Sequence, residues 1–543
     1  MYNSNMLVDL KRAKIIFPIF LGVSLSIGFL LGFFFTSDKR ATAMQYPFSE
    51  IAEVSQLLEK YYFDSVSAKK LTQEAIRGML ANLDPHSSYI SKEETEQTNA
   101  MLMGEFEGIG IQFNVLNDTV LVISVNAGGP SQKAGLLPGD KIIWVDSIKV
   151  ANVKIQNTEI IRLLRGKKGT SVKVGILRQN ISKPLYFKII RDKIPVHSVV
   201  AAYMIAPQIA YININNFAVS TGEEFHKALK DLVLRQNADK LIIDLRGNPG
   251  GYLESAIKIC DDLLPAKKLI VYTYGQAVGK QNYYADKGGI FTSDKQQVVV
   301  LIDEYSASAS EIVAGALQDH DRGIVIGRRS FGKGLVQRQF NLQDGSEVMI
   351  TVARYYTPTG RCIQRPFESE NMDDYYNDIY NRYQKGEMQS ADSITFPDSL
   401  CFLTPKGKKV YGGGGIMPDI FIPIEKSDSI IYFNVLNNQQ IVFLYAVEYA
   451  DKNRTQIKEK YPKGADFIKN FTINEAMLKE ILAKNQVTEL KKQPLPKESA
   501  QMLRQWLKAY IGRNLYGDNT FYQIVNQEDK VIQAAIREFK NVK

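Results

Sequence analysis

The chain of 543 residues contains only four histidines and three cysteines. The histidines are His86, His197, His226 and His320. They form neither an HExxH motif nor another pair with metal-ligand spacing, which argues against a metalloenzyme. The cysteines, Cys260, Cys362 and Cys401, are too few and too scattered for a disulfide framework or a CxxC zinc site, and their odd number leaves at least one thiol free. We therefore expect no bound metal and no cofactor.

The overall composition excludes several classes of protein. Hydrophobic residues make up 45% of the chain and charged residues 23%, which are ordinary values for a globular protein. Disordered, collagen-like and coiled-coil proteins are therefore excluded, and we find no internal repeats. At about 150 residues per domain, the length predicts three or four domains.

The net charge of +9 first suggests an acidic partner such as nucleic acid. The basic excess lies at the two ends, however: +3 within residues 1–40 and +6 within residues 426–543, whereas residues 41–425 carry 43 groups of each sign. We therefore expect no nucleic acid partner. Helical patterns, such as those over Asp466–Lys484 and Lys497–Ile511, predict a basic helical extension over residues 426–543. Anionic lipid, an adaptor, self-association and plain solvent exposure all stay open for this extension.

Ile15–Phe35 is a run of 21 residues without a charge. A helix of this length, at about 1.5 Å per residue, crosses a hydrocarbon core of about 30 Å. The basic residues within Lys11–Lys14 precede the run, and the positive-inside bias then keeps the N-terminus in the cytoplasm. We expect residues 1–40 to form a cytoplasmic tip and a transmembrane signal anchor of a single-pass inner-membrane protein, with the catalytic part in the periplasm. A signal peptide cleaved at Ala41–Ala43 is the alternative.

Residues 41–103 are predicted to form a helical region, because apolar residues recur there at three- and four-residue steps. Asp84–Tyr89 interrupts this pattern with the Asp-Pro and Ser content of a turn. His86 lies in this turn, and we interpret it as a local hydrogen-bonding residue.

Short β-branched runs separated by glycine and proline predict a compact domain over residues 104–192. Strands are expected at Val120–Val125, Lys141–Val145, Ser171–Leu177 and Leu185–Ile190, and a helix at Asn157–Leu164. Gly108, Ile109, Gly110 and Ile111 form a loop whose backbone N–H groups can turn toward one anion. Together with the segment Ala134–Ile142, this loop resembles that of a PDZ domain, which binds a chain-terminal carboxylate while the peptide adds as a strand to the sheet edge. A glycine-rich hairpin without a ligand is the alternative.

Residues 193–425 alternate apolar strands with helical stretches, which is an α/β pattern. Strands are expected at Ile209–Ile214, Lys240–Leu245, Leu269–Thr273 and Gln297–Ile302. Helices are expected at Gly222–Leu234, Leu253–Leu264 and Ser310–Asp319. An insertion over about residues 365–411, rich in tyrosine and acidic residues, follows.

Two segments of this region are candidates for binding an anion or for nucleophilic chemistry. Asp244–Gly251 ends in Pro-Gly-Gly, and paired glycines let backbone N–H groups approach an anion or an oxyanion closely. Ser306–Glu311 places three serines next to a predicted helix N-terminus, where the local field favours negative charge. One of these serines is a candidate nucleophile, although serine is also an ordinary N-cap residue.

A nucleophilic serine needs a base, and no histidine is well placed to act as one. Lys333 lies between two glycines, and a desolvated lysine has a lowered pKa, so its neutral amine can take a proton from serine. Gln337 lies four residues later on the same face and can orient the amine. The surrounding segment imitates a phosphate-binding loop, but Gly334 stands where a magnesium-binding Ser or Thr is needed, so we reject that interpretation.

In this order, the helical region, the PDZ-like module and these segments resemble the C-terminal processing peptidases, also called tail-specific proteases. The resemblance covers about residues 48–425 and includes Tyr355–Arg361 and Gly415–Asp419. It implies a multidomain α/β protein with a PDZ domain and a crotonase- or ClpP-like α/β protease core over residues 193–425, between helical N-terminal and C-terminal regions. The implied activity is that of a serine endopeptidase whose PDZ domain binds protein substrates by their apolar C-terminal tails.

The same resemblance implies that Ser308, the middle serine, is the nucleophile, that Lys333 is the base and that Gln337 assists it. The oxyanion donors would be the N–H of Ala309 and that of Gly250 or Gly251, and the choice between the two glycines stays open. The resemblance implies no role for the insertion, and the basic extension lies outside the part of the chain that it covers.

Three further interpretations are weighed. A PDZ domain next to the core suggests that tail binding regulates the site, with Arg165 as a sensor, although an ordinary surface arginine is the alternative.

A catalytically silent PDZ scaffold or chaperone would bind C-termini without cleaving them, and the complete set of Ser308, Lys333 and Gln337 argues against it. Acyl-ester hydrolysis of the penicillin-binding type would rest on Ser67-x-x-Lys70, a spacing that arises readily by chance on a charged helix, and we find no Lys-Thr-Gly partner.

Overall fold

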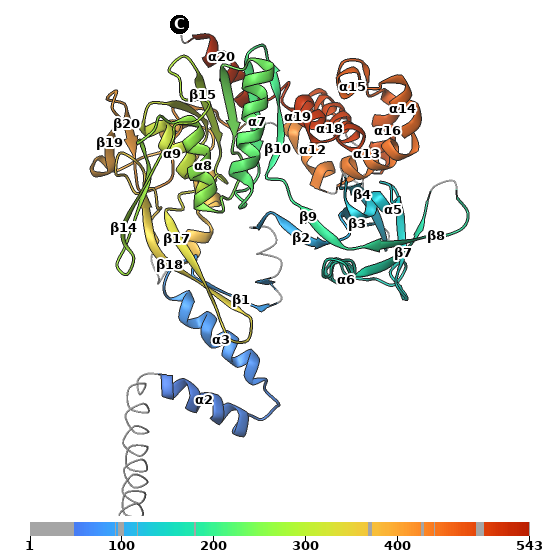
Figure 1. The fold of residues 1–543 in the computed structure, drawn as a ribbon, viewed down its shortest axis with the longest axis horizontal. Coiled ribbons are helices and arrows are strands. Elements are labelled where there is room, and N and C mark those ends of the chain that lie inside the picture. The colour runs from blue at the N-terminus through green and yellow to red at the C-terminus, as the bar shows by residue number, and fades with distance from the viewer. Residues whose placement is uncertain are drawn as a thin grey trace, which may run out of the picture. The chain divides into compact units, whose positions relative to one another are not determined.

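The computed structural model describes residues 48–541 except 93, 96–102, 117, 127, 179–180, 368–371, 425–427, 439 and 485–493. The chain divides into two units, Met1–Leu80 and Ala81–Lys543. The first unit contains helix α2 (Phe48–Tyr61) and most of helix α3 (Ala68–Ala81), as the helical pattern predicted. The elements described below belong to the second unit (Figure 1).

Among the residues just named, no helix is both long enough and apolar enough to cross a membrane. Helix α18 (Lys497–Tyr516), for example, has 20 residues, but charged side chains occur along its length. This finding corrects the expected location as a single-pass protein of the inner membrane with a periplasmic catalytic part. The run Ile15–Phe35, on which the expected anchor and membrane contact depended, lies outside the described residues.

The PDZ region forms an antiparallel sheet in the order β3-β4-β5-β7-β8, with β6 paired to β5. The strands are β3 (Ile111–Leu116), β4 (Thr119–Val125), β5 (Lys141–Val145), β6 (Ile148–Lys149), β7 (Ser171–Leu177) and β8 (Leu185–Ile190), and the helices are α5 (Pro130–Ala134) and α6 (Asn157–Leu164). The predicted spans of β5, α6, β7 and β8 are confirmed. Strand β7 shows why: Val172, Val174 and Ile176 alternate into the domain core while intervening residues are more exposed or small. A ribbon of β2 (Glu105–Gly108) and β9 (Asp192–Pro195) joins the two ends of this region.

The protease core is built on a six-stranded sheet in the order β10-β11-β12-β15-β16-β21. Its strands are β10 (Val199–Ala206), β11 (Ile209–Ile214), β12 (Lys240–Asp244), β15 (Gln297–Ile302), β16 (Gly323–Gly327) and β21 (Ile420–Phe421). Strand β10 is antiparallel to β11, and the other neighbours are parallel. Strand β11 is buried at every position, as expected for a sheet covered on both faces.

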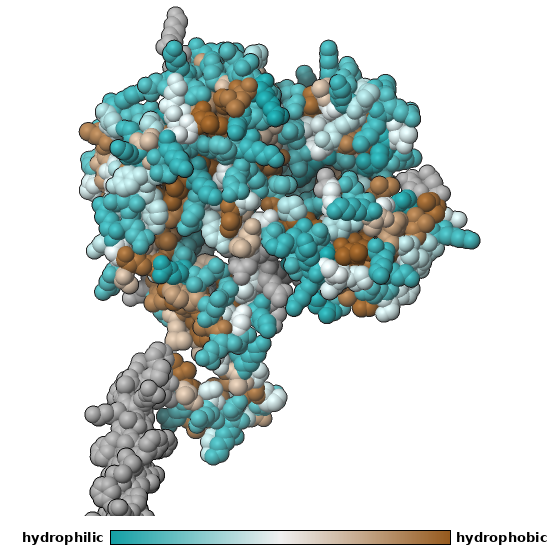
Figure 2. Space-filling view, in the orientation of Figure 1, coloured by the Kyte–Doolittle hydropathy of each residue, from teal (hydrophilic) through white to brown (hydrophobic). Residues whose placement is uncertain are grey.

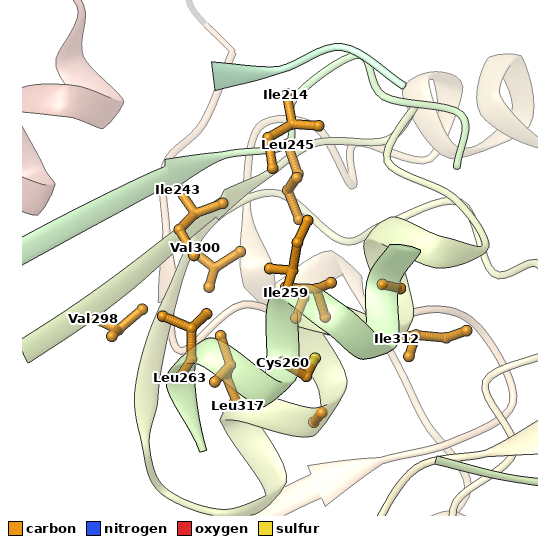
Figure 3. Close-up of a cluster of buried hydrophobic side chains, with 14 of the residues drawn as sticks. Ile214, Ile243, Leu245, Ile259, Cys260, Leu263, Val298, Val300, Ile312 and Leu317 are labelled. Carbon is orange, nitrogen blue, oxygen red and sulfur yellow. The ribbon is translucent and has the colours of Figure 1, made fainter. Parts of the chain in front are cut away.

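Three helices cover one face of this sheet: α7 (Thr221–Gln236), α8 (Leu253–Leu263) and α9 (Ala309–Asp319). In Figure 3, Ile243, Val298 and Val300 of the strands lie opposite Ile259, Leu263 and Leu317 of helices α8 and α9. This packing fixes helix α9, and therefore its N-terminus, against the sheet. On the view in Figure 2 the surface is mainly hydrophilic, with hydrophobic residues in separate patches, as expected when such faces are buried.

A helix of the C-terminal extension covers the opposite face of the sheet. Helix α20 (Lys530–Asn541) buries Ile532, Ala535 and Phe539 in a cluster with residues of the core strands, such as Tyr211 and Leu301. The extension is therefore packed against the protease core through its last helix. Whether residues 426–543 also bind an adaptor or a second copy stays a prediction, as do the expected domain boundaries.

The other described helices of the extension pack on one another. They are α12 (Asp428–Asn438), α13 (Ile441–Lys452), α14 (Arg454–Lys460), α15 (Gly464–Asn470), α16 (Glu475–Ala483), α18, given above, and α19 (Asp518–Val525). The helical pattern predicted over Asp466–Lys484 is confirmed, and it consists of two helices, α15 and α16. The side chain of Asn474 starts α16 by accepting a hydrogen bond from the N–H of Met477 at 3.0 Å.

A second, antiparallel sheet lies beside the core. It consists of β1 (Ser88–Ile90), β13 (Leu269–Gly275), β14 (Gly279–Tyr284), β17 (Leu335–Asn341) and β18 (Glu347–Tyr356). The insertion after β18 contains α10 (Met372–Tyr376), α11 (Asp378–Gln384), two short 3-10 helices (Ala391–Ser393 and Asp398–Leu400) and the hairpin of β19 (Cys401–Leu403) and β20 (Lys409–Tyr411). Strand β17 begins two residues after Lys333, so this sheet determines the course of the chain at the candidate base.

Candidate active site

The candidate nucleophile lies on the turn between strand β15 and helix α9. The carboxylate of Asp303 holds this turn by accepting hydrogen bonds from the N–H groups of Gly247 at 2.9 Å and of Tyr305 at 3.1 Å. Ser308 precedes the first residue of α9 and has φ of 55° and ψ of −113°. A residue with a side chain rarely adopts this strained conformation, and a strained strand-to-helix turn is the setting in which some hydrolases expose a nucleophilic serine.

The three serines of the segment have different environments. Ser306 and Ser310 are buried, and their hydroxyls donate to the carbonyl oxygens of Leu245 at 2.8 Å and of Asn248 at 3.0 Å. Ser308 is only half-buried. The two outer serines therefore have structural roles, and Ser308 is the accessible one.

The buried carboxylate of Glu311 joins Ser308 to the Lys333 segment. Its Oε2 accepts hydrogen bonds from the N–H groups of Ser308 at 2.8 Å and of Lys333 at 2.9 Å. Its Oε1 accepts from the N–H of Gly332 at 2.7 Å and from the hydroxyl of Ser330 at 2.5 Å. Burial raises the pKa of Glu311 to about 7, although these four donors act in the opposite direction. Glu311 has the spacing from Ser308 that a capping box has, and this was the available sequence signal for it.

A second buried group, Tyr355, lies between the same two residues. Its hydroxyl oxygen is 3.1 Å from the carbonyl oxygen of Ser308 and 2.5 Å from that of Lys333. Burial raises the pKa of Tyr355 well above its ordinary value, so the hydroxyl keeps a proton to donate. Glu311 therefore binds the N–H groups of both candidate residues, and the hydroxyl of Tyr355, which has one proton to donate, contacts both of their C=O groups, that of Lys333 at the shorter distance.

Lys333 is half-buried on a crowded segment of chain. Burial lowers its pKa, and the negative charges of Glu311 and Asp84 oppose that fall. A Cβ atom at Gly334 would lie 2.8 Å from the backbone N of Gln364, so a side chain there would collide with the neighbouring backbone. The neighbouring glycine therefore lets the chain approach residue 364 closely, which keeps Lys333 in its desolvated place.

The glycine pair lies directly beside Ser308. A Cβ at Gly250, where φ is 96°, would lie 2.7 Å from the Cβ of Ser308 and 2.9 Å from the N of Ala309, so only glycine fits. The N–H of Gly250 donates to Oδ1 of Asn248 at 2.8 Å. Ala309 is the first residue of α9, where an N–H group has no acceptor within the helix.

Gln337 lies opposite Thr351 in the pairing of β17 with β18. Its Nε2 donates to the hydroxyl oxygen of Thr351 at 3.3 Å, and that hydroxyl donates to Oδ1 of Asp84 at 2.9 Å. Asp84 and Thr351 are 267 positions apart in the chain, so the sequence carried no signal that linked them.

His86 and the insertion also lie close to the Lys333 segment. The N–H of His86 donates to Oδ1 of Asp84 at 2.9 Å, which is the local hydrogen bond that we expected, and Nε2 of its ring lies 2.7 Å from the hydroxyl of Tyr375 in α10, a partner distant in sequence. Burial and the positive charge of Lys333 lower the pKa of His86 to about 4, so its ring is neutral at neutral pH. The guanidinium carbon of Arg365 lies 4.0 Å from the ring centroid of Phe331 and 3.8 Å from that of Tyr375. The insertion therefore packs against the residues that precede Lys333.

The far end of helix α9 is fixed by a buried ion pair. Arg361, which is fully buried, donates to Oδ1 of Asp319 at 2.7 Å, to Oε1 of Gln318 at 2.7 Å and to the carbonyl oxygen of Tyr411 at 3.0 Å. Because Asp319 is the last residue of α9, this network anchors the helix whose first turn follows Ser308.

The candidate carboxylate-binding loop lies between β2 and β3. Gly108 ends β2, Ile109 is buried in the domain core, and Ile111 begins β3. Gly110 has φ of 73°, and a Cβ there would lie 2.9 Å from Cδ1 of Ile194. Strand β3 is at the edge of the described sheet, next to the loop, where a peptide strand can add. Arg165 follows α6, and its guanidinium carbon is 5.1 Å from the ring centroid of Phe106 in β2.

The described residues contain no cluster of histidine, cysteine and acidic side chains that could hold a metal ion.

Four family models match the chain. "Peptidase family S41" matches residues 208–369 and "PDZ domain" matches residues 108–189. "Activating protease CtpB N-terminal domain" matches residues 35–95, and "Family of unknown function (DUF8443)" matches residues 432–517 in the C-terminal extension.

Known proteins of similar sequence include two bacterial peptidases. The carboxy-terminal-processing protease of Bartonella bacilliformis is 38% identical over 326 residues, which cover 59% of this chain and 74% of that protein. The carboxy-terminal processing protease CtpB of Bacillus subtilis is 36% identical over 320 residues, 58% of this chain and 65% of that protein. A solved structure of a photosystem II D1 C-terminal processing protease aligns with 25% identity over 69% of this chain and 92% of that chain, with a TM-score of 0.34.

Proposed function

The chain belongs to the carboxy-terminal processing protease family, as a serine-type peptidase with a PDZ domain, and we propose that Ser308 is its nucleophile and Lys333 its general base. The observation that carries this proposal is the shared carboxylate oxygen of Glu311, which binds the backbone N–H groups of both residues. Because both N–H groups bind the same oxygen atom, the backbone of Ser308 lies close to the backbone of Lys333. The serine hydroxyl and the lysine amine therefore extend from neighbouring positions.

In the proposed reaction, the neutral amine of Lys333 takes the proton of the Ser308 hydroxyl as Oγ attacks the carbonyl carbon of the substrate peptide bond. The amine then passes that proton to the leaving nitrogen, which leaves an acyl-enzyme on Ser308. Water, activated by the same amine, hydrolyses the ester and restores both groups. The lowered pKa of Lys333 supports this role, because it raises the fraction of neutral amine near neutral pH.

For the oxyanion we propose the N–H of Ala309 together with that of Gly251. Ala309 has its N–H at the start of α9, where the helix supplies no acceptor. Of the two glycines, Gly250 already donates its N–H to Asn248, which favours Gly251 as the second donor. Two such donors stabilise the negative charge that develops on the carbonyl oxygen in the transition state.

We propose that the PDZ domain binds a substrate by its apolar C-terminal tail. The N–H groups of the loop Gly108–Ile111 would hold the terminal carboxylate, and the tail would pair with β3 at the edge of the described sheet. Arg165, at the end of α6 and close to the β2 ribbon, is proposed to sense the bound tail.

The test of the proposed catalytic pair uses the full chain and a fluorescence-quenched peptide that ends in apolar residues with a free carboxylate. Ser308→Ala and Lys333→Ala should each reduce cleavage to background while tail binding is retained. The matched control is Lys287→Ala, which removes an exposed lysine and should cleave at the normal rate. Normal turnover by either of the first two variants would refute the assignment, and tail binding without any cleavage by the unmodified chain would instead favour a silent PDZ scaffold.

A further inference from the structure

A chain of hydrogen bonds leads from the buried carboxylate of Asp84 to the amide of Gln337. Oδ1 of Asp84 accepts from the hydroxyl of Thr351 at 2.9 Å, and Oγ1 of Thr351 accepts from Nε2 of Gln337 at 3.3 Å. On its other side, Oδ2 of Asp84 accepts from the hydroxyl of Ser87 at 2.5 Å, and Oγ of Ser87 accepts from the N–H of Thr351 at 3.1 Å. Thr351 is therefore held by its backbone and by its hydroxyl.

Strand pairing brings these residues together. Gln337 and Thr351 are direct partners in the antiparallel pairing of β17 with β18, so their side chains emerge on the same face. Strand β1 pairs with the other edge of β18, where Ser88 is the partner of Met349. The turn Asp84–Ser87 leads into β1 and so reaches the side chain of Thr351.

The proton count along this chain fixes the direction of every hydrogen bond. An ionised carboxylate only accepts, so Thr351 must give its single hydroxyl proton to Asp84. The hydroxyl oxygen of Thr351 can then only accept, and Gln337 must turn its NH₂ group toward it. The carbonyl oxygen of the same amide consequently points away from Thr351, and the two ends of the amide are not interchangeable.

Asp84 has the surroundings of a permanently ionised group. Only 8% of its surface is exposed, and the N–H groups of His86 at 2.9 Å and of Ser87 at 3.0 Å donate to its Oδ1 as well. Burial by itself raises the pKa of Asp84, but the hydrogen bonds from Ser87, His86 and Thr351 outweigh it and leave the pKa lowered. The donors and acceptors of the hydrogen bonds from Gln337 through Thr351 to Asp84 are therefore the same over the neutral pH range.

We propose that Asp84 is a positioning residue of the peptidase site, which acts through the Thr351 hydroxyl to hold the Gln337 amide with its oxygen toward the Lys333 amine. The amide oxygen then accepts an N–H of Lys333 and orients the amine lone pair toward Ser308. This inference rests on the proposed function, in which Lys333 is the base, and on the expectation from the sequence that Gln337 assists it. The charge of Asp84 also acts on Lys333, which places the two groups in one electrostatic environment.

The test is a double-mutant cycle in the full chain with the fluorescence-quenched peptide described above. Thr351→Val removes the hydroxyl and keeps the backbone N–H, so Gln337 loses its orientation without a change of charge. We expect kcat to fall by about 10-fold to 100-fold, the range typical of a misplaced catalytic group, with KM unchanged. Thr351→Ser retains the hydroxyl and should keep kcat within about twofold of the unmodified chain. In a Gln337→Ala background, Thr351→Val should cause no further loss, because the group that it positions is gone.

The outcomes separate the two proposals. An equal loss from Thr351→Val in both backgrounds, or no loss in either, would overturn the role of Asp84 while leaving Ser308 and Lys333 in place. Unchanged kcat in Gln337→Ala would overturn both the role of Gln337 and this inference, and cleavage by Lys333→Ala would refute the proposed function itself. Thermal unfolding of each variant shows that it is folded, and Asp84→Asn takes the place of Thr351→Val in the cycle if the valine variant is not.

Discussion

Ser308 and Lys333 donate their backbone N–H groups to the same atom, Oε2 of Glu311, at 2.8 and 2.9 Å. The two residues come from a strand-to-helix turn and from the segment before β17, and these segments are also joined by the hydroxyl of Tyr355 and by a hydrogen bond from the N–H of Phe331 to the carbonyl oxygen of Ser306 at 3.0 Å. A carboxylate on the first turn of α9 thus sets the spacing of the proposed nucleophile and base. The first prediction follows from this arrangement.

Glu311→Gln should abolish most peptidase activity and destabilise the fold. An amide has one acceptor oxygen, so its NH₂ group would face either the N–H groups of Ser308 and Lys333 or the donors from Gly332 and Ser330. Two N–H donors lose their acceptor in the first orientation and one does in the second, where the hydroxyl of Ser330 can accept from the amide, and each loss destabilises by about 1–3 kcal/mol. Urea unfolding and kcat measure both effects, and Glu498→Gln, at an exposed position in α18, is the control. A variant with normal kcat would show that Glu311 does not set the register.

The pH dependence of activity should show an acid limb. The pKa of Lys333 is lowered from the ordinary lysine value of 10.5. The base is active only after it loses its proton, so kcat/KM should rise with pH until the pH exceeds this lowered pKa. Glu311 acts in the same direction, because below its pKa of about 7 it takes up a proton and loses part of its acceptor capacity. A pH–rate profile measures the limb. A profile without an acid limb over the whole pH range in which the chain stays folded would contradict a lysine base.

The contribution of Glu311 to the free energy of unfolding should fall as pH rises, whereas activity should rise. Its folded pKa, about 7, lies above the ordinary value of 4.5, so the folded chain binds more protons between these values than the unfolded chain does. The contribution of this group to stability is therefore complete below about pH 4.5 and is lost as pH rises to about 7. The unfolding free energy of Glu311→Gln, which cannot ionise, compared with that of the unmodified chain at pH 5 and pH 8, isolates this contribution. An equal difference at both pH values would show that the pKa of Glu311 is not raised.

Cleavage should depend on a free C-terminal carboxylate. A peptide with an amidated C-terminus lacks the anion that the loop Gly108–Ile111 is proposed to bind, so kcat/KM should fall relative to the free acid. If Arg165 senses the tail, Arg165→Ala should reduce the ratio of kcat/KM for the free-acid peptide to kcat/KM for the amidated peptide. Lys149→Ala, at an exposed position elsewhere in the PDZ region, should keep the ratio. An unchanged ratio in Arg165→Ala would leave Arg165 as an ordinary surface arginine.

The last helix of the C-terminal extension should be required for a stable protease core. Ala535 is fully buried against the sheet, and Ala535→Asp would place a carboxyl group there without a partner. We expect a loss of at least about 2 kcal/mol in the free energy of unfolding. Arg537→Asp, at an exposed position of the same helix, is the matched control and should unfold normally. Equal stability of the two variants would show that α20 does not cover the sheet.

Local patterns predicted many of the elements because the physical cause is local. Strands such as β7 and β11 were predicted from alternating or continuous apolar residues, and helix α6 from its periodicity and its flanking turn. The helical pattern over Asp466–Lys484 did not reveal where α15 ends and α16 begins, because Asn474 caps the second helix within a pattern that stays helical on average. Expectations about residues 1–47 concern a part of the chain that the structure does not describe.

By itself, the sequence determined the family, the PDZ and peptidase regions, and a short set of candidate residues that includes Ser308 and Lys333. These depend on residue types and spacings that can be recognised within one segment. Only the tertiary structure decided which serine is accessible, that Glu311 and Tyr355 hold the candidate pair, and that Asp84 reaches Gln337 through Thr351. Such contacts join residues far apart in the chain, and their direction depends on strand register and on which donors are already used. Neither is encoded in any single stretch of sequence.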